Sequence, residues 1–259
     1  NPTFEERELC STELFVSGMN KKFVVFLLCL SSFVQAEKLT VALYAGANPP
    51  YTIIKGYEES GIFIDIFAEL ELLTEHTFEL VHYPFARVMR EFDEGRIDIE
   101  PGVNESWRQH AKVLGEYTVP YEVSTEVIVY KRANRISVKS PQDLFGKSVG
   151  IVRGYSYPDF DDAFERKDIN RIDNLSEKLL LRQLLHDRVP LIFIGYRTIL
   201  YYKKSNPEYK SLLIGDVVNL SEVKLRLHPS KAYLLPEFNQ AINQMKANGT
   251  IESIYNKYR

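Results

Sequence analysis

Three segments of the chain combine an arginine or an aromatic residue with a predicted loop. They are Pro49–Tyr51, Tyr83–Arg87 and Gly102–Arg108. A guanidinium held beside an aromatic wall in a partly desolvated cleft is suited to bind a carboxylate through two parallel hydrogen bonds. Arg108 and Arg87 are therefore candidate ligand-binding residues. The competing interpretation for both is an ion pair at the surface, and Trp107, the only tryptophan, is expected to serve packing first.

The segment Gly154-Tyr155-Ser156-Tyr157-Pro158 follows a predicted strand and precedes a predicted helix. Backbone N–H groups at a helix start, with a hydroxyl beside them, favour an anion. Arg153, Tyr155 and Ser156 are therefore further candidate ligand contacts. The alternative is an N-cap that contacts no ligand. A nucleophilic serine is a weaker interpretation, because Pro158 stands where a nucleophile elbow has its second glycine.

The chain offers little for catalysis, a metal or a cofactor. The five histidines have no H-x-x-x-H or H-E-x-x-H spacing, so no metal site is expected. Acidic residues among the arginines of segment 87–96 are typical of a solvated, ion-paired helix face. We expect no catalytic residue, no metal and no cofactor.

The composition is that of a globular protein. Of 259 residues, 45% are hydrophobic and 26% charged, and the formal net charge is −3. The chain is long enough for one large core or two smaller ones. The sequence has no cluster of basic residues that could bind along a phosphate backbone, so we do not expect nucleic acid as a partner.

The first 36 residues have the pattern of an export signal. A charged stretch at 19–22 precedes the apolar run 23–30 and a V-x-A cleavage site ending at Ala36. The apolar run is shorter than the roughly 20 residues of a membrane span, and Cys29 lacks the preceding small residue of a lipoprotein site. We expect residues 1–18 to be upstream sequence and 19–36 a cleaved signal peptide. Both cysteines, Cys10 and Cys29, then leave with it, which suits a bacterial periplasm.

From Glu37 onward, short apolar strands alternate with segments of helical period, which predicts an α/β protein. Strands are expected at 39–43, 78–82, 126–130, 148–152, 191–194 and 223–227. Helices are expected at 61–73, 84–93, 141–145, 158–166, 176–187, 195–203, 236–247 and 250–258.

Two polar stretches suggest that the chain passes between two lobes. They are 131–141 and 216–222. The expected division is a first lobe of 37–130, a second lobe of 131–221, and a return to the first at 222–259. Ligands bind at the carboxyl ends of strands in open sheets, so the cleft between the lobes is the expected binding site.

Taken together in this order and spacing, several segments resemble the family-3 extracellular solute-binding proteins. They are Leu39–Ala42 with Pro49–Tyr51, Gly61–Ile66, Gly95–Asp98, Trp107-Arg108, Val119–Tyr121, Asp143–Gly150 and Asn248–Ile251. The resemblance covers about residues 38–259. It implies the type II periplasmic binding fold, with two α/β lobes joined by two hinge strands.

The resemblance also implies roles for particular residues. Arg108, following a segment that matches Gly102–Asn104, would clamp a ligand carboxylate from the first lobe. The loop 153–156 would add backbone N–H groups from the second lobe, Tyr51 would cover the ligand side chain, and Tyr196 is a further candidate contact.

One departure affects the ligand. The family usually has an acidic residue after the strand at 191–194, which pairs with the α-ammonium group, and this chain has Gly195. A buried ammonium without a carboxylate partner is costly. Either another acid such as Glu105 takes the role, or the solute lacks a free α-ammonium group; Arg87 and Arg153 favour the second option slightly.

The resulting hypothesis is a monomeric periplasmic binding protein for a small carboxylate-bearing solute, an amino acid or a related anion. Closure would follow because the ligand contacts both lobes. An ABC importer permease or a membrane sensor is the expected partner. Two rivals stay open: a prephenate- or arogenate-type dehydratase on the same fold, and an adaptor that binds no small molecule.

Overall fold

The computed structural model describes residues 36–45 and 48–259. The predicted upstream segment and the signal peptide up to residue 35 lie outside this part. The strands are β1 (Lys38–Tyr44), β2 (Ile53–Lys55), β3 (Glu58–Ser60), β4 (Thr77–Tyr83), β5 (Ile99–Val103), β6 (Glu116–Tyr117), β7 (Glu122–Tyr130), β8 (Ser148–Val152), β9 (Asn170–Asn174), β10 (Leu191–Gly195) and β11 (Leu213–Leu227). The helices are α3 (Ile62–Thr74), α4 (Phe85–Asp93), α5 (Pro158–Glu165), α6 (Glu177–Leu185), α7 (Tyr196–Ser205), α8 (Leu235–Ala247) and α9 (Thr250–Lys257). Among these helices, none has the length and apolar character needed to cross a bilayer.

Helix α3 illustrates how the sequence pattern positions an element. Ile62, Ile66 and Leu70 recur at helical spacing and are fully or almost fully buried, so one face packs on the sheet and the opposite face meets solvent. The helix ends at Glu75, which adopts a left-handed conformation with φ of 58°. The predicted helix at 61–73 is confirmed within one residue.

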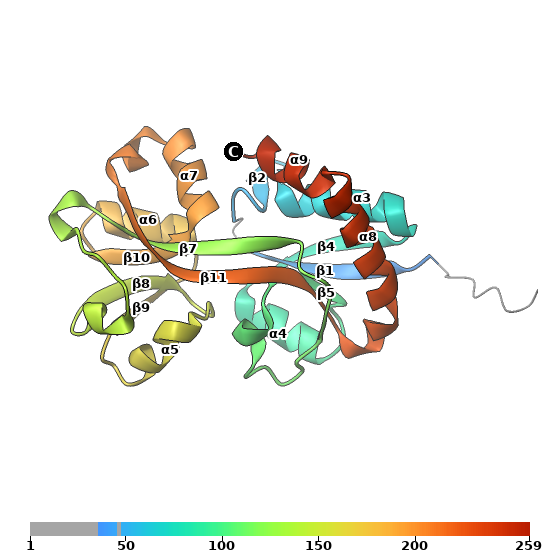
Figure 1. The fold of residues 1–259 in the computed structure, drawn as a ribbon, viewed down its shortest axis with the longest axis horizontal. Helices are drawn as coiled ribbons and strands as arrows, with labels where there is room; N and C mark the ends of the chain where they lie inside the picture. The colour runs from blue at the N-terminus through green and yellow to red at the C-terminus, as the bar shows by residue number, and fades with distance from the viewer. Residues whose placement is uncertain (1–35, 46–47) are drawn as a thin grey trace, which may run out of the picture. The chain divides into compact units, whose positions relative to one another are not determined.

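The first half of the fold is built on the parallel strands β4, β1 and β5. Helices α3, α8 and α9 lie together on one side of these strands, and α4 lies on the other side (Figure 1). The apolar faces of α3, α8 and α9 share one core with residues of β1 and the C-terminal part of β11, whereas α4 packs in a separate cluster with Ala42 and Ile97. This half therefore uses both the start and the end of the described chain.

The second half is built on the parallel strands β10, β8 and β9, with α5, α6 and α7 packed around them. Two clusters of buried side chains fill the two faces of this part of the sheet. In both halves, parallel strands end toward the same region, which places loops and helix starts there.

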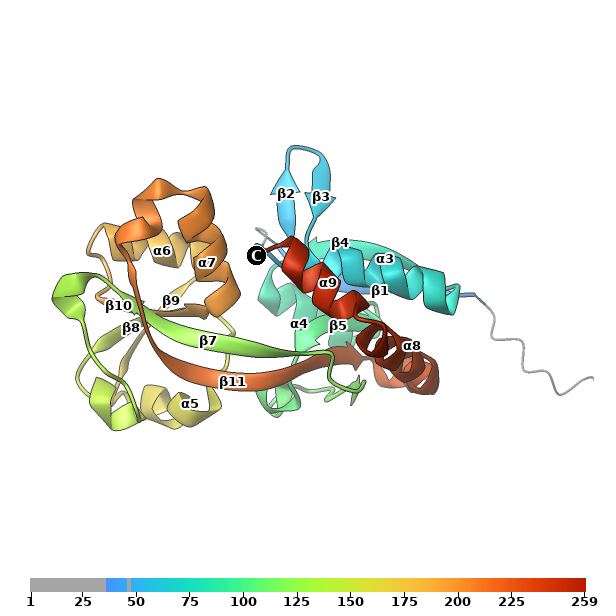
Figure 2. The same ribbon diagram turned by 45° about the horizontal axis from the view of Figure 1, so that its top comes forward.

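Strands β7 and β11 join the halves. They pair antiparallel along most of their length, and Figure 2 shows them running side by side from one half to the other. The chain at each strand packs in both sets of cores: Tyr121, just before β7, and Val223 of β11 in the first, and Val127 of β7 and Val218 of β11 in the second.

The division into lobes is best drawn from these cores. Residues 127–130 pack in the second half, so we propose that the first crossing lies near Tyr121, earlier than the polar stretch 131–141 suggested. The second expected crossing, 216–222, falls inside β11. Polar side chains there reflect a strand between the lobes, not a loop.

All six predicted strands are present, and most helix boundaries agree within one or two residues. The segment at 141–145 is a short 3-10 helix instead of an α-helix. Strands β5 and β9, the short strands β2, β3 and β6, and the N-terminal parts of β7 and β11 were not predicted. The mixed α/β architecture agrees with the expected fold class.

Candidate functional site

A cavity lies where the two halves face each other. It encloses about 940 Å3 of space, part of which is open to solvent. Its walls come from the ends of β1, β5, β8 and β10, from β7 and β11, and from the starts of α5 and α6. Aromatic rings dominate the lining: Tyr44, Tyr51, Phe63, Trp107, Tyr155, Tyr157 and Tyr255. A cavity lined mainly by aromatic side chains, with a few polar groups among them, is typical of a small-molecule site.

The two halves touch beside this cavity. The Asn48 Nδ2 donates to the Tyr155 hydroxyl at 3.3 Å, and the Thr198 hydroxyl donates to Asn48 Oδ1 at 3.4 Å. Gly154, in the loop after β8, approaches Phe85 so closely that an added Cβ would lie 2.3 Å from the ring. The glycine also has φ of 87°, which favours a residue without a side chain.

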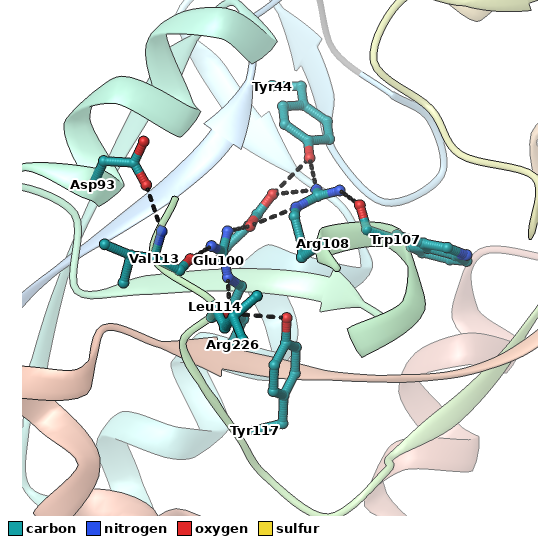
Figure 3. Close-up of polar contacts among 9 residues, drawn as sticks. All are labelled: Tyr44, Asp93, Glu100, Trp107, Arg108, Val113, Leu114, Tyr117 and Arg226. Atoms are coloured by element: carbon teal, nitrogen blue, oxygen red, sulfur yellow. Dashed lines mark hydrogen bonds and ion pairs between the residues drawn. The ribbon is translucent and has the colours of Figure 1, made fainter. Parts of the chain in front are cut away.

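Arg108 belongs to a buried cluster of charges at one end of the cavity (Figure 3). Its Nη2 donates to Glu100 Oε1 at 2.5 Å and its Nε donates to Glu100 Oε2 at 3.2 Å. From the other side, the Arg226 Nη1 donates to Glu100 Oε2 at 2.7 Å. Glu100 is 1% exposed and the two arginines 6% and 0%, so one carboxylate is shared by two buried guanidinium groups.

Neighbouring groups complete this cluster. The Arg226 side chain also donates to the carbonyl oxygens of Leu114 and Val113 and lies over the Phe92 ring at 3.8 Å. The Tyr44 hydroxyl donates to Glu100 Oε1 at 2.7 Å. Burial alone would raise the pKa of Glu100, but the arginines outweigh it and lower that pKa to about 2.

The donors of Arg108 are almost fully used within the described part of the chain. Besides the two bonds to Glu100, its Nη2 donates to the Tyr44 hydroxyl at 2.7 Å and its Nη1 to the Trp107 carbonyl at 3.0 Å. A guanidinium has five N–H groups, which leaves a single Nη1 N–H. The predicted bidentate clamp on a solute carboxylate therefore has a competitor that the sequence did not reveal: Glu100 occupies that face.

Other predicted residues also line the cavity. Tyr51 packs against Phe63 with ring centroids 5.2 Å apart. Gly102 has φ of 72°, and a Cβ there would lie 2.6 Å from the Phe63 ring. Tyr155 and Ser156 line the opposite wall.

The loop at the start of α5 is also occupied from within. The Ser156 hydroxyl donates to Asp161 Oδ2 at 2.6 Å, and the Tyr157 N–H donates to the same carboxylate at 3.0 Å. Asp161 therefore takes the place in which the sequence suggested a solute anion.

The remaining predicted residues lie outside the cavity lining formed by residues 36–45 and 48–259. Asn104 caps the short helix that carries Arg108 and donates to the Glu222 carbonyl at 2.7 Å. Arg87 lies over the Tyr83 ring at 3.7 Å and pairs with Glu91. Arg153 and Tyr196 are exposed. Their ligand-binding roles stay predictions without a contact that supports them.

Two glutamates that the sequence did not single out are buried in the lining of the same cavity. Glu126 of β7 is 9% exposed and Glu177, the first residue of α6, is 6% exposed. The Glu177 Oε1 accepts from the Gly195 N–H at 3.2 Å. Within the described residues, the Oε2 atom of each glutamate is buried and has no hydrogen-bond partner.

Both glutamates are held in an environment that favours the protonated acid. Burial, followed by the nearby Glu177 carboxylate, raises the pKa of Glu126 well above its usual range. Burial raises the pKa of Glu177 to about 7, against the opposing hydrogen bond from Gly195. Two adjacent carboxylates without a cation in this environment have a strong affinity for a proton or for another positive charge.

Because Gly195 has no side chain, it leaves room for the carboxylates of Glu126 and Glu177. A Cβ on Gly195 would lie 3.5 Å from Glu177 Oε1 and 3.7 Å from Glu126 Oε1. The acid expected after strand 191–194 is thus absent from that position, but two carboxylates from β7 and α6 reach the same place. Glu105, the alternative suggested by the sequence, instead pairs with Lys224.

Acidic and histidine side chains are otherwise dispersed. Among residues 36–45 and 48–259, no group of three or more histidine, cysteine, aspartate or glutamate residues is placed to hold a metal ion.

Comparison with known proteins identifies relatives of this architecture. Residues 39–259 match the family described as bacterial extracellular solute-binding proteins, family 3. The L-cystine-binding protein TcyJ of Escherichia coli K12 is 24% identical over 174 residues, which cover 66% of this chain and 63% of TcyJ. The match thus spans slightly less than two thirds of that relative.

Two solved structures show the same fold. An ancestral arginine-binding protein bound to arginine has a TM-score of 0.72 and 22% identity, covering 85% of this chain and 97% of that one. The ancestral amino acid-binding protein AncCDT-1, a precursor of cyclohexadienyl dehydratase, has a TM-score of 0.69 and 18% identity, covering 85% and 95%. These likenesses confirm the type II periplasmic binding fold that the sequence predicted.

Proposed function

Because this chain belongs to the family-3 bacterial extracellular solute-binding proteins, we propose that it binds a small solute in the cavity between its halves. The solute is an amino acid or a related small molecule, in line with the relatives named for L-cystine and arginine. The cavity itself carries the proposal. It is lined from both halves and contains buried polar atoms without partners in the described chain, including Trp107 Nε1, Glu126 Oε2 and Asn219 Nδ2.

A solute in this position favours the closed arrangement. It contacts residues of both halves at once, so its binding free energy is larger when the halves are together. The closed monomer then presents the solute to an ABC importer permease or signals it to a membrane sensor. The family and the predicted signal peptide support a periplasmic location, and the intact mass of exported protein should correspond to a chain that starts at Glu37.

The first experiment identifies the solute. Protein purified without refolding is denatured mildly, and the released small molecules are identified by mass spectrometry. Each candidate is then titrated while Trp107 fluorescence is recorded, since this only tryptophan lines the cavity. We expect a saturable change that a Trp107→Phe variant lacks although it still binds by calorimetry. If no solute is released and none of a broad panel changes fluorescence or melting temperature, the proposal fails.

A dehydratase is the second candidate function, and one observation favours it. Glu177 lies in the cavity with its pKa raised to about 7, and a carboxylic acid protonated near neutral pH can donate a proton to a leaving hydroxyl group. A turnover assay on prephenate and arogenate separates the two functions. A rate well above background that Glu177→Gln abolishes would favour the enzyme.

A further inference from the structure

We infer that the cavity selects its solute through a positively charged nitrogen, which binds between Glu126 and Glu177, and not through a carboxylate. This inference rests on the proposed solute-binding function and narrows the class of solute to amines, with or without a carboxylate.

The geometry of the two glutamates is that of a cation subsite. Their side chains come from different elements, β7 and α6, and their Oε1 atoms converge within 3.5 and 3.7 Å of the Cβ position of Gly195. Both side chains are more than nine-tenths buried and line the cavity, and each Oε2 lacks a hydrogen-bond partner in the described chain. The hydroxyls of Ser124, Tyr157 and Thr198 lie near the pair, and an ammonium group would add further donors for the two Oε2 atoms.

The charged groups around the pair do not supply that donor. Glu122, on the same strand as Glu126, pairs with Arg197 at 3.5 Å. Arg197 also lies over the Tyr255 ring at 4.5 Å. Within residues 36–45 and 48–259, no lysine or arginine forms an ion pair with either buried glutamate. Among the described residues the pair is therefore neutralised by protons, and a cationic solute can replace them.

The uncharged neighbours of the pair also suit a cation. The titratable groups that face it are the hydroxyls of Tyr51 and Tyr155, and of Tyr157 at the start of α5. Burial raises the pKa of each of these phenols, so they stay neutral. Aromatic rings attract a desolvated ammonium group through their faces.

The groups that were expected to hold a solute carboxylate are occupied by carboxylates of the chain. Glu100 takes two donors of Arg108, and Asp161 takes the Ser156 hydroxyl and the Tyr157 N–H. Within the described residues, a solute carboxylate finds one remaining N–H of Arg108 and the backbone N–H groups of Gly154 and Ser156. A solute ammonium meets two carboxylates that have no ion-pair partner there. We therefore expect the solute nitrogen to contribute more to the binding free energy than a solute carboxylate.

The test uses probes that share a carbon skeleton. Phenethylamine, phenylalanine and phenylpyruvate form one series, and 3-methylbutylamine, leucine and 4-methyl-2-oxopentanoate form a second, with putrescine as a diamine. Each is added at millimolar concentration to the full mature chain near pH 8, where the glutamates are most readily ionised. We expect amines to raise the melting temperature, and the 2-oxo acids not to do so.

Two variants then test whether amine binding depends on Glu126 and Glu177. For the best-binding amine, Glu126→Gln and Glu177→Gln should each weaken affinity at least tenfold in calorimetry, which is about 1.4 kcal/mol. Glu165→Gln is the matched control: it removes one exposed carboxylate from α5, and affinity should stay within about twofold. In Glu177→Gln, the glutamine keeps an oxygen that can accept from the Gly195 N–H. Melting curves check that both variants fold.

The outcomes separate this inference from the proposed function. If a 2-oxo acid stabilises the protein as well as its amine, or no amine stabilises it, or both glutamine variants keep the parent affinity, the cation subsite is refuted. The proposed function survives any of these results when another solute is found in the purified protein. The comparison of amine with 2-oxo acid needs no variant, so a folding defect cannot obscure it.

Discussion

Replacing Glu100 by glutamine should destabilise the protein strongly, because it leaves two buried arginines without their shared counter-ion. The expected loss in the free energy of unfolding follows from the pKa of Glu100. Relative to an ordinary value of 4.5, a pKa of about 2 in the folded protein corresponds to about 3 kcal/mol. Removing one partner of a buried ion pair is generally worth about 3–5 kcal/mol. The two estimates agree, so we expect Glu100→Gln to lose about 3 kcal/mol near neutral pH.

The pH dependence gives this prediction a second test. Since the folded pKa is below the unfolded value, the stabilisation is complete above the unfolded pKa and is lost as pH falls toward about 2. Urea unfolding near pH 7 and near pH 3 should show the difference between parent and variant shrinking from about 3 to about 1 kcal/mol. A difference below about 1 kcal/mol near pH 7, or one that does not change with pH, would refute the reasoning.

The same substitution tests whether Glu100 blocks Arg108. Glutamine keeps one acceptor oxygen in place of two, so one of the two Arg108 donors that Glu100 holds, Nε or Nη2, becomes free. Affinity for a 2-oxo acid should therefore rise in Glu100→Gln by about tenfold, the size of a charge-assisted hydrogen bond. Unchanged affinity in a folded variant would mean that Arg108 is not blocked by Glu100.

Three further changes have outcomes that follow from the geometry. Glu177→Gln should stabilise the solute-free protein near pH 8 by up to about 3 kcal/mol and leave its stability unchanged near pH 4. The raised pKa of Glu177 means that folding favours the protonated acid, so the parent protein loses stability as the pH rises to about 7. Chemical denaturation at both pH values checks this, and equal stability of parent and variant at pH 8 would contradict it. Gly154→Ala should lower the melting temperature, because φ of 87° is strained for alanine. It should also weaken solute binding at least tenfold, because the new methyl group meets the Phe85 ring of the opposite half; calorimetry on the identified solute decides, and parent-like affinity would show that the two segments need not touch. Ser176→Ala should cost about 1 kcal/mol, because its hydroxyl caps α6 by accepting from the Leu179 N–H at 3.3 Å, and urea unfolding should detect the loss; a change near zero would mean that water replaces the cap.

Much of the fold was predictable because most elements carry a clear period. The helices bury one face, and their apolar spacing marks them directly. Strand β5 was missed because Pro101 and Gly102 lie in it, and both residues argue against a strand in sequence. The N-terminal part of β11 was missed because Asp216, Asn219 and Glu222 make it polar, as in a loop. These residues are polar because this part of β11 runs between the two cores and is partly exposed to solvent.

The candidate site was harder to predict, because the sequence shows side chains but not their partners. Arg108 was recognised as a cation near the cleft, yet its partner Glu100 lies in the strand that was missed, and Arg226 comes from the far end of the chain. Glu177 follows the N-cap Ser176, a position where an acid is expected for helix stability alone. Glu126 is the first residue of the strand predicted at 126–130 and is followed by four buried apolar residues. A charged residue beside such a buried run was the available signal.

Strands β7 and β11 have a mechanical consequence for this cavity. Both pass between the halves, and both supply its lining, through Glu122 to Glu126 and through Asn219 and Val223. The ladder between them is irregular around Val217 and Asn219, where bending is easiest. Under the proposed closure, a bound solute therefore contacts the strand segment that bends. We expect substitutions that stiffen this segment to change the residence time of the solute as well.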